Sequence, residues 1–438
     1  MKFLIPEGLR VLDLGCGTGN LLDALKPDFG VGVDFSPLMI KEARSKFPEH
    51  TYIHGDIEDP EIISKLPGPF DVIVLSDAIG QLDDCQASLE QLHAVCNPDT
   101  RLIISYYNPI WEPLLAIAEK LRLKSPQPHL NWLSAKDIAN MLWLAHFEPI
   151  KQDWRQLIPR KMFGLGHAIN RFIAPLPLIR LLCLRHYVVA RSLKHHEKTE
   201  YPVTVLIPCR NEKGNIEDAV KRLPRFSPDI EVLFVEGHSK DGTLEEIYRV
   251  IEAYPDLDIK ALVQPGIGKA DAVSAGFSIA RGELLMILDA DLTMPPEDLP
   301  KFYQAIINGK GEFINGSRLV YPLEKDSMRL FNRFANKIFS WTFSYLLNQR
   351  FTDTLCGTKV LKKKDYLNIM ANKSYFGDFD PFGDFDLIFG ASKLNLKVAE
   401  VPIRYAARNY GETQISRMSH GWLLVRMVGF AYLKLKAF

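Results

Sequence analysis

Two aspartates follow an apolar run in the stretch 284–296, LLMILDADLTMPP. We expect the run to form a buried strand, along which the alternation of side chains would place Asp289 and Asp291 on one face. Two ionised carboxylates side by side repel each other unless a cation lies between them. Oxygen ligands suit Mg²⁺ or Mn²⁺, which commonly complete their coordination shell with phosphate oxygens. The pair therefore predicts a metal site that holds a diphosphate at the carboxyl end of a parallel strand.

Other polar motifs follow the strands expected nearby. VTVLIPCRNE (203–212) ends in polar residues, and VLFVEGHSKDGTLEEI (232–247) passes through a Gly/Ser turn into a helix. QPGIGKADAVSAGF (264–277) places Lys269 beside glycines at the start of another helix, and FTDTLCGTKVLKKKD and GDFDLIFGASKLNLKVAEVPIRY follow downstream. This set resembles the family 2 glycosyltransferases over residues 202–438. It is most similar to the branch that transfers sugars to polyprenyl phosphates.

The resemblance implies roles for the matching residues. Lys269 would face the diphosphate, Asp384 or Asp386 would be the acceptor-side base, and Arg404, with Arg408 and Arg417, would clamp an acceptor phosphate. Asp289 and Asp291 would bind the metal. The nucleotide-sugar would be held by Pro208, Arg210, Asn211, Glu212, Glu236, Ser239, Asp241, Gly268, Lys269 and Asp289. The alternatives are a helix cap for Asp384 and solvent-facing charges for Lys269 and the arginines.

Two departures from the family pattern leave details open. EGHS (236–239) stands where the family usually has DDGS, so the nucleobase preference is undetermined. Thr293 stands where dolichyl-phosphate mannosyltransferases often have glutamine, so a third protein ligand to the metal is undetermined.

The first half carries a different motif, VLDLGCGTGN (11–20), in which three glycines separate an expected strand from an expected helix. Glycine permits positive φ and lets a ligand approach the backbone, and the helix N-terminus offers free N–H groups. Asp13 lies at the strand end, where its carboxylate could accept from an amino group or order the loop. Asp34 ends the next expected strand, where it could grip two ribose hydroxyls. Asp56, after the third, is placed to read an adenine amino group.

Together with VGVDFSP, GDIED and FDVIVLSD, this motif resembles the class I S-adenosylmethionine-dependent methyltransferases over roughly the first 190 residues. By that resemblance the cofactor S-adenosylmethionine would be held by Asp13, Gly15, Gly17, Gly19, Asp34, Asp56 and Ile57, with Ser76 near its sulfonium end. One alternative is a Rossmann-like domain without a nucleotide. NAD is disfavoured, because the third, helix-packing glycine of its fingerprint is missing.

Short apolar runs alternate with helical patterns in both halves, which indicates α/β folds with mainly parallel sheets. We predict two Rossmann-like domains: a methyltransferase-type sheet over residues 1–194 and a GT-A-type nucleotide-sugar transferase sheet over 202–438, joined by a polar linker, 195–201. The first-half strands are expected at 10–15, 30–35, 51–56, 70–77 and 101–107, with 147–154 and 185–193 as a closing hairpin. The second-half strands are expected at 203–209, 230–237, 259–264, 284–291 and 311–317.

Composition limits the partners and the compartment. Lys+Arg and Asp+Glu balance at 53 each, so no bulk charge indicates nucleic acid. The six cysteines have no metal-binding spacing, which favours a reducing, cytoplasmic compartment. No apolar run reaches the roughly 20 residues that span a bilayer. The basic, apolar segments 160–182 and 422–438 could nevertheless lie on the inner face of the cytoplasmic membrane, or simply pack on their own domains.

The predicted protein is a bifunctional, metal-dependent, inverting glycosyltransferase fused to a methyltransferase, acting in cell-envelope assembly. Its partners would be a nucleotide-diphosphate sugar and a polyprenyl phosphate or glycan acceptor. The alternative is a soluble sugar-to-sugar transferase whose first half only binds cofactor or acts as a scaffold. The sugar, the nucleotide and the methyl acceptor are not determined by the sequence.

Overall fold

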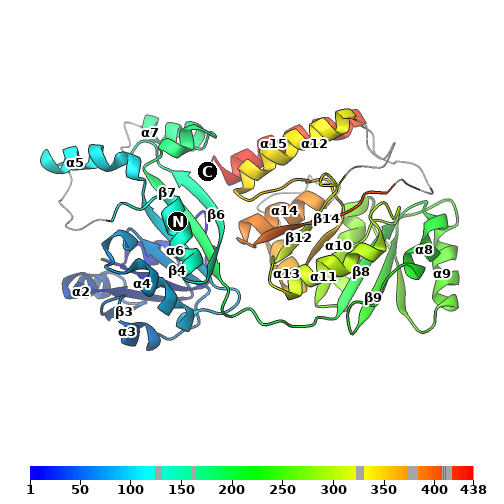
Figure 1. Cartoon of the computed structure of the whole chain (residues 1–438), viewed down its shortest axis with the longest axis horizontal. Helices are drawn as coiled ribbons and strands as arrows, with labels where there is room; N and C mark the ends of the chain where they lie inside the picture. The colour runs from blue at the N-terminus through cyan, green and yellow to red at the C-terminus, as the bar shows by residue number, and fades with distance from the viewer. Residues whose placement is uncertain are drawn as a thin grey trace. The chain divides into compact units, whose positions relative to one another are not determined.

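The computed structural model describes residues 1–123, 131–159, 164–321, 330–372, 383–406, 408, 410 and 417–437. Its contacts separate two units: Met1–His196 together with Leu435–Phe438, and Glu197–Lys434. Each unit is a mixed sheet with helices packed against it (Figure 1). The division falls between residues 196 and 197, inside the segment predicted to be a linker.

The first unit contains a seven-stranded sheet in the order β3-β2-β1-β4-β5-β7-β6. Strands β1 to β5 run parallel, whereas β7 pairs antiparallel with both β5 and β6. The predicted closing hairpin is therefore confirmed. The strands are β1 (Arg10–Leu14), β2 (Phe29–Asp34), β3 (Thr51–His54), β4 (Val72–Ser76), β5 (Arg101–Tyr107), β6 (Phe147–Arg155) and β7 (Arg185–Ser192).

Helices pack on both faces of this sheet, because alternate strand residues contribute to two apolar clusters. In β1, Leu12 and Leu14 belong to one cluster and Val11 to the other. Ser36 caps α2, and Ser134 forms a capping box at α6. The helices are α1 (Asn20–Leu25), α2 (Pro37–Lys46), α3 (Pro60–Ser64), α4 (Cys85–Gln91), α5 (Glu112–Lys120), α6 (Ala135–Leu144) and α7 (Leu165–Ala168), with the shorter η1 (Ile79–Gln81), η2 (Leu92–Val95), η3 (Pro109–Trp111), η5 (Ile169–Ile173) and η6 (Ile179–Leu182).

The segment Leu435–Ala437 follows the second unit in sequence but packs within the first. The buried ammonium of Lys436 lies 3.4 Å from a carboxylate oxygen of buried Asp153. Arg155 and Arg171 donate to backbone carbonyls of the same segment at 3.1 and 3.0 Å. Burial alone would raise the pKa of Asp153, but Lys436 and Arg155 outweigh it and lower that pKa to about 2. The first unit is thus built from two separate parts of the chain.

The second unit has its own seven-stranded sheet, in the order β10-β9-β8-β11-β13-β12-β14. β10, β9, β8 and β11 are parallel, and β13 is antiparallel to both neighbours. The strands are β8 (Val203–Cys209), β9 (Ile230–Glu236), β10 (Asp258–Val263), β11 (Leu284–Ile287), β12 (Phe313–Ser317), β13 (Lys359–Lys362) and β14 (Val398–Pro402). The sequence prediction missed β13 and β14.

Helices lie on this sheet too, so the predicted pair of Rossmann-like α/β sheets is confirmed (Figure 1). Among the helices described, none combines the length and the apolar character that crossing a membrane requires. The helices are α8 (Ile216–Lys221), α9 (Thr243–Ala253), α10 (Lys269–Ile279), α11 (Leu299–Ile307), α12 (Leu330–Leu347), α13 (Lys363–Ala371), α14 (Asp384–Lys393) and α15 (Arg417–Leu435), with η7 (Lys213–Asn215) and η8 (Pro296–Asp298).

One expectation about β11 is wrong. The strand ends at Ile287, so Asp289 and Asp291 lie in the following turn and do not share a strand face. The turn closes through a hydrogen bond of 3.1 Å from the Leu292 amide to the Asp289 carbonyl, and Leu292 adopts a positive φ of 51°. This backbone allows the two carboxylates to take different partners.

Candidate active site

In the second unit, the loops after β8 and β9 lie at the carboxyl edge of the sheet and are bonded to each other. The Asn211 amide donates to the Ser239 hydroxyl at 2.9 Å, and the Lys240 amide donates to the Asn211 side chain at 2.8 Å. Asn211 has a positive φ of 56°, a conformation that asparagine tolerates better than most residues. The predicted nucleoside-binding residues of these two loops are therefore held in one network.

Two acidic residues order the second of these loops through backbone amides. The buried carboxylate of Glu236 accepts from the amides of His238, at 3.1 Å, and Ser239. The carboxylate of Asp241 accepts from the amides of Lys213, at 3.2 Å, and Thr243, at 3.1 Å. EGHS thus closes its turn with one glutamate.

Four charged groups from distant parts of the sequence meet beside β11. The Lys269 ammonium lies 2.7 Å from Asp289 and 3.8 Å from Asp384, and the ammonium of fully buried Lys359 lies 3.5 Å from Asp384. Burial lowers the pKa of Lys269, but Asp289 and Asp384 outweigh burial and raise it above its ordinary value. Burial raises the pKa of Asp289, but Lys269 outweighs it and lowers that pKa. Lys269 and Asp289 are therefore both charged at neutral pH.

Backbone packing brings this cluster together. A Cβ on Gly357 would lie 1.9 Å from a carboxylate oxygen of Asp289 and 2.5 Å from the Lys269 nitrogen. A Cβ on Gly383, the residue before α14, would lie 3.0 Å from the Cα of Ala270 in α10. The N-termini of α10 and α14 thus approach each other, and both favour anions.

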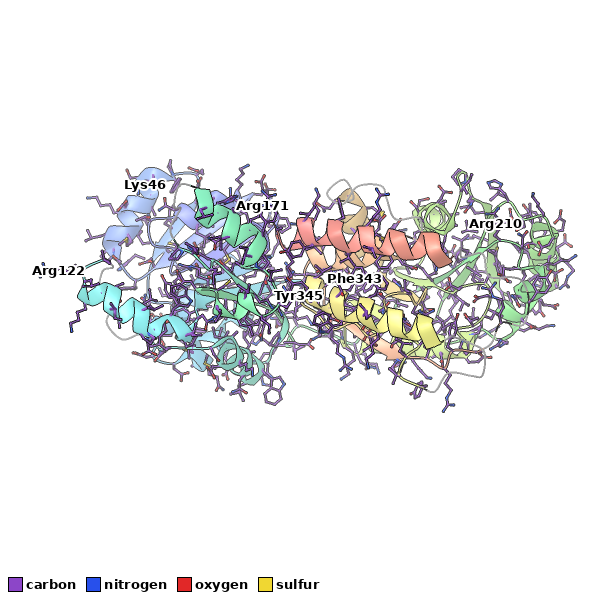
Figure 2. The ribbon with its side chains drawn as sticks, turned by 90° about the horizontal axis from the view of Figure 1, so that it is seen from above. Lys46, Arg122, Arg171, Arg210, Phe343 and Tyr345 are labelled. Atoms are coloured by element: carbon purple, nitrogen blue, oxygen red, sulfur yellow. The ribbon has the colours of Figure 1, made fainter. Side chains whose placement is uncertain are left out.

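An aromatic contact supports α14 from its other side. Phe343 of α12, labelled in Figure 2, lies 5.2 Å from Phe385 and 5.8 Å from Phe389 between ring centroids. These rings hold the first turn of α14, which carries Asp384.

Asp291 belongs to a second ionic group. Arg408 donates to its carboxylate at 2.6 Å and also lies 3.5 Å from Glu212. The Thr293 amide and hydroxyl donate to Asp291 at 3.1 and 2.8 Å. Burial is the largest influence on Glu212 and raises its pKa to about 7. Arg408 is thus an ionic partner of Asp291, not only a surface charge.

Asp289 and Asp291 remain suitable donors for a divalent cation. They are two carboxylates at the edge of the sheet, where Mg²⁺ or Mn²⁺ would share its shell with diphosphate oxygens and water. Their mutual repulsion is offset in the protein itself, because Lys269 pairs with one and Arg408 with the other. Within the described residues, the group of three adjacent Asp, Glu, His or Cys donors lies in the first unit and consists of Asp23, Glu49 and His50.

The other predicted residues of this unit are placed as follows. Arg404 is exposed, with its guanidinium 5.4 Å from the Tyr321 ring. Asp386 is half-buried in the first turn of α14, and Arg210, labelled in Figure 2, is exposed. Pro208 lies in β8, and Gly268 precedes α10 with a positive φ of 95°. The side chain of Arg417 is outside the described part of the chain.

Sequence reasoning missed a buried, two-point ion pair of the unit, between Arg318 and Asp353. Arg318, directly after β12, binds both carboxylate oxygens of fully buried Asp353 at 2.6 and 2.8 Å. Burial raises the pKa of Asp353, but Arg318 outweighs it and lowers that pKa to about 2. Asp353 lies in the FTDTLCGTK motif, four residues before Gly357. A charged residue so close to a glycine-containing loop was the one sequence signal that it has a structural partner.

In the first unit, the glycine loop after β1 has the predicted backbone. Gly15, Gly17 and Gly19 all have positive φ, at 76°, 52° and 78°. A Cβ on Gly15 would lie 2.8 Å from the Cβ of Ala78, and one on Gly19 would lie 2.4 Å from the Tyr52 hydroxyl. A Cβ on Gly17 would have no atom within 4 Å, so this glycine faces open space that a ligand can enter.

Asp13 and Asp34 have different surroundings at this loop. Asp34 accepts from the amides of Gly17, at 2.8 Å, and Ser36, at 2.9 Å, so it joins the loops after β1 and β2. Asp13 is 1% exposed, and both of its carboxylate oxygens are buried without a hydrogen-bond partner among the described residues. Burial, followed by the charge of Asp34, raises the pKa of Asp13 to about 7.

The remaining predicted residues lie at the same edge of the sheet. Asp56 is exposed and accepts from the Glu58 amide at 2.9 Å, while Ile57 and Ser76 are half-buried. Next to Ser76, Asp77 pairs with Arg185 of β7 at 2.7 Å, a contact that the sequence did not indicate because 108 residues separate the partners. The open glycine, the unpartnered carboxylate and the positive-φ loop together fit a cationic, amino-acid-bearing nucleoside such as S-adenosylmethionine.

Each unit is similar to known proteins. The family model Glycosyl transferase family 2 matches residues 204–366. Dolichol-phosphate mannosyltransferase of Pyrococcus furiosus is 29% identical over 217 residues, which are 49% of this chain and 59% of that protein. Undecaprenyl-phosphate 4-deoxy-4-formamido-L-arabinose transferase of Klebsiella pneumoniae is 24% identical over 220 residues, which are 49% of this chain and 63% of that protein. The chain thus spans less than two thirds of these relatives.

A second model, described as a methyltransferase domain, matches residues 1–152. Solved structures similar to the chain include magnesium protoporphyrin IX methyltransferase of Synechocystis, at 20% identity and a TM-score of 0.29, covering 42% of this chain and 75% of that one. An S-adenosylmethionine-dependent methyltransferase of Mesorhizobium loti has 20% identity and a TM-score of 0.32, covering 42% and 91%. The N-terminal part of the chain thus matches the model of a methyltransferase domain, and residues 204–366 match the model of the family 2 glycosyltransferases, so the chain resembles a fusion of the two.

Proposed function

We propose that the C-terminal unit transfers a sugar from a nucleotide-diphosphate donor to a polyprenyl phosphate, with inversion at the sugar carbon. The N-terminal unit transfers a methyl group from S-adenosylmethionine, and both act in cell-envelope assembly at the inner face of the cytoplasmic membrane. The ionic cluster of Lys269, Lys359, Asp289 and Asp384 carries the first part of this proposal. It lies where the N-termini of two helices converge, a place suited to a departing diphosphate.

Each charged residue then has a distinct task. Lys269, at the start of α10, neutralises charge on the leaving diphosphate, and Asp384 together with Asp289 holds its ammonium in place. A Mg²⁺ or Mn²⁺ ion bound by Asp289 and Asp291 would add Lewis-acid stabilisation of the same leaving group. Asn211, Glu236 and the loop around them hold the nucleoside.

The environment of Asp384 favours a lipid phosphate over a sugar hydroxyl as acceptor. A hydroxyl must lose a proton to a base, whereas a phosphate oxygen is already anionic. Asp384 lies 3.8 and 3.5 Å from two ammonium groups, so its carboxylate is already engaged by cations of the protein. The relatives named for dolichol phosphate and undecaprenyl phosphate support the same acceptor class. The soluble sugar-to-sugar alternative requires a base, and Asp386 in the same turn of α14 is the other candidate for it.

The decisive experiment is a mass-spectrometric transfer assay. Purified full-length protein is incubated with undecaprenyl phosphate, Mn²⁺ or Mg²⁺ and a panel of UDP- and GDP-sugars, with and without EDTA. We expect a glycosylated phospholipid that disappears with EDTA, and this product is the first candidate to test for methylation. Product with a glycan acceptor alone would replace the lipid proposal by the sugar-to-sugar alternative.

Asp291→Asn should abolish sugar transfer, with a loss of about 10³-fold or more, because it removes a metal ligand and weakens the 2.6 Å ion pair with Arg408. The same variant should bind Mn²⁺ more weakly in calorimetry. Asp298→Asn, on η8 outside the ionic groups, is the matched control. Near-normal turnover by Asp291→Asn would refute the metal assignment.

Asp384→Asn tests the role of that carboxylate. The sequence alone predicts a loss only with hydroxyl acceptors, but the two lysine contacts lead us to expect a loss of about 10²-fold with polyprenyl phosphate as well, since Lys269 would lose one of its two holding groups. Transfer rates with both acceptor classes are compared. A loss restricted to hydroxyl acceptors would restore the general-base role.

A further inference from the structure

The first unit carries a large apolar surface that its own core does not use. Nine residues form α5, yet none of them is buried, and none is buried in η5 or η6 either. Leu178 is 81% exposed, and Leu121 is 63% exposed. The other exposed apolar side chains here are Ile110, Leu114, Ile117, Leu123, Leu165, Phe172, Ile173, Leu176, Leu181 and Leu182. We call residues 110–123 and 164–182 the docking face.

Hydrogen bonds join the two segments into one structure. The Asn108 side chain donates to the carbonyls of Leu181, at 2.8 Å, and Cys183, at 3.0 Å. The Trp111 indole donates to the Leu182 carbonyl at 2.8 Å. α5 and α7 lie at the same end of the unit, away from α2, α3 and α4 (Figure 1). The apolar side chains therefore belong to one continuous region.

Charge on the docking face has one predominant sign. No Asp or Glu occurs between Asp153 and Glu197, whereas Arg171 and Arg180 lie within that interval. Lys120 and Arg122 end the α5 segment and are exposed. Figure 2 labels Arg122 at the end of α5 and Arg171 just after α7. The acidic residues of the face, Glu112 and Glu119, are confined to α5.

The position of the face connects it with the candidate methyl-transfer site. α5 and η3 follow the carboxyl end of β5, and the segment 164–182 precedes β7, whose Arg185 pairs with Tyr107 at that same end. β1 and β4 run parallel to β5, so the glycine loop and Ser76 lie at the same edge of the sheet. A surface bound to the docking face would thus lie beside the edge that binds cofactor.

We propose that the docking face binds an anionic phospholipid membrane, with its Leu, Ile and Phe side chains among the lipid chains and its Arg and Lys side chains at the headgroups. Exposed apolar area of this extent marks an interaction surface. Basic residues beside apolar ones, with acidic residues absent from the whole 154–196 interval, suit anionic lipid specifically. This assigns membrane contact to the methyltransferase unit, independently of any contact that the transferase unit makes with its acceptor.

The test is flotation of the full chain with vesicles of phosphatidylcholine alone or mixed with phosphatidylglycerol, without sugar donor. We expect binding to the anionic vesicles that weakens with salt, and at least a tenfold loss of binding for Leu178→Asp/Leu181→Asp. Leu121→Asp, on the other segment of the docking face, should also weaken binding. This single variant keeps the test valid if the double variant does not fold. Leu38→Asp, in α2 and 76% exposed, is the matched control and should bind as the wild type does.

The outcomes separate this inference from the proposed reaction. Unchanged vesicle binding by both variants, or equal binding to the two vesicle types, would overturn it. Conversion of a dimer to a monomer by Leu178→Asp/Leu181→Asp, without vesicle binding by the wild type, would also overturn it, because the face would then join two copies of the chain. Sugar transfer to undecaprenyl phosphate dissolved in detergent needs no vesicle, so its failure would refute the proposed function and leave the docking result intact.

Discussion

Gly357→Ala should reduce sugar transfer by about 10²-fold or more. The added methyl group would lie 1.9 Å from Asp289 and 2.5 Å from Lys269, and real Cβ atoms do not approach other heavy atoms so closely. The two side-chain ends must therefore move apart. Displacing a catalytic group by about 1 Å commonly costs 10²-fold in rate. The measurement is kcat/KM in the transfer assay, with thermal unfolding as a check on folding.

A matched variant makes the Gly357 result interpretable. Gly429→Ala, in α15, adds the same methyl group where no atom lies within 4 Å, and it should leave transfer unchanged. Binding of S-adenosylmethionine by the first unit should be the same in both variants. Wild-type transfer by Gly357→Ala would show that the Lys269–Asp289 pair does not need its present geometry.

Asp13→Asn should stabilise the cofactor-free protein above pH 7 while weakening S-adenosylmethionine binding by roughly 10²-fold. The pKa of Asp13 is raised from 3.8 to about 7, mainly by burial. Between those values the folded protein holds a proton that the unfolded chain has lost, so this group reduces stability as pH rises and imposes its full cost above pH 7. That cost is on the order of 4 kcal/mol. The asparagine amide would itself be buried without hydrogen-bond partners, which offsets part of the stability gained by removing the charge. The net increase in the free energy of unfolding should be about 2 kcal/mol.

The pH dependence distinguishes this account from a general effect of the substitution. Unfolding of the wild type and Asp13→Asn is compared from pH 5 to pH 8.5, and the stability difference should shrink towards the acid end, where Asp13 is already neutral. Calorimetry gives the affinity for S-adenosylmethionine, whose loss reflects the missing carboxylate opposite a cationic ligand. Exposed Asp28→Asn is the control for both measurements. A variant that binds the cofactor normally would assign Asp13 to loop order only.

The features that the sequence predicted well are local. The three loop glycines, Gly15, Gly17 and Gly19, adopt positive φ. A side chain at Gly15 or Gly19 would clash with a neighbour, and Gly17 leaves space for a ligand. The spacing of the glycines in the sequence was enough to predict this loop. The first sheet with its closing hairpin, and five of the seven strands of the second sheet, followed from apolar periodicity. The Asp-x-Asp motif was expected at the end of a strand over 284–291, but β11 ends at Ile287, four residues earlier, so both aspartates lie in the following turn.

The features that were missed are the long-range partners of charged residues. Lys269 meets Asp384 across 115 positions, and Arg408 meets Asp291 across 117, so neither pair has a local signal. Arg318 and Asp353 are closer in sequence, but their pairing depends on β12 and β13 lying side by side, and β13 was not predicted. Such long-range pairs determine which side chains of a site are charged, and they can be identified only from the folded structure.

The pairing of Lys436 with Asp153 affects how the protein is made. Lys436 and its neighbours leave the ribosome after the entire transferase unit, so Asp153 and Arg155 remain without this partner until that unit has been synthesised. An N-terminal fragment cut at residue 196 would keep that buried carboxylate but lose the ammonium 3.4 Å from it. Expression of the methyltransferase part alone therefore calls for a fused copy of residues 435–438, and translation sets an order in which the first unit is completed after the second.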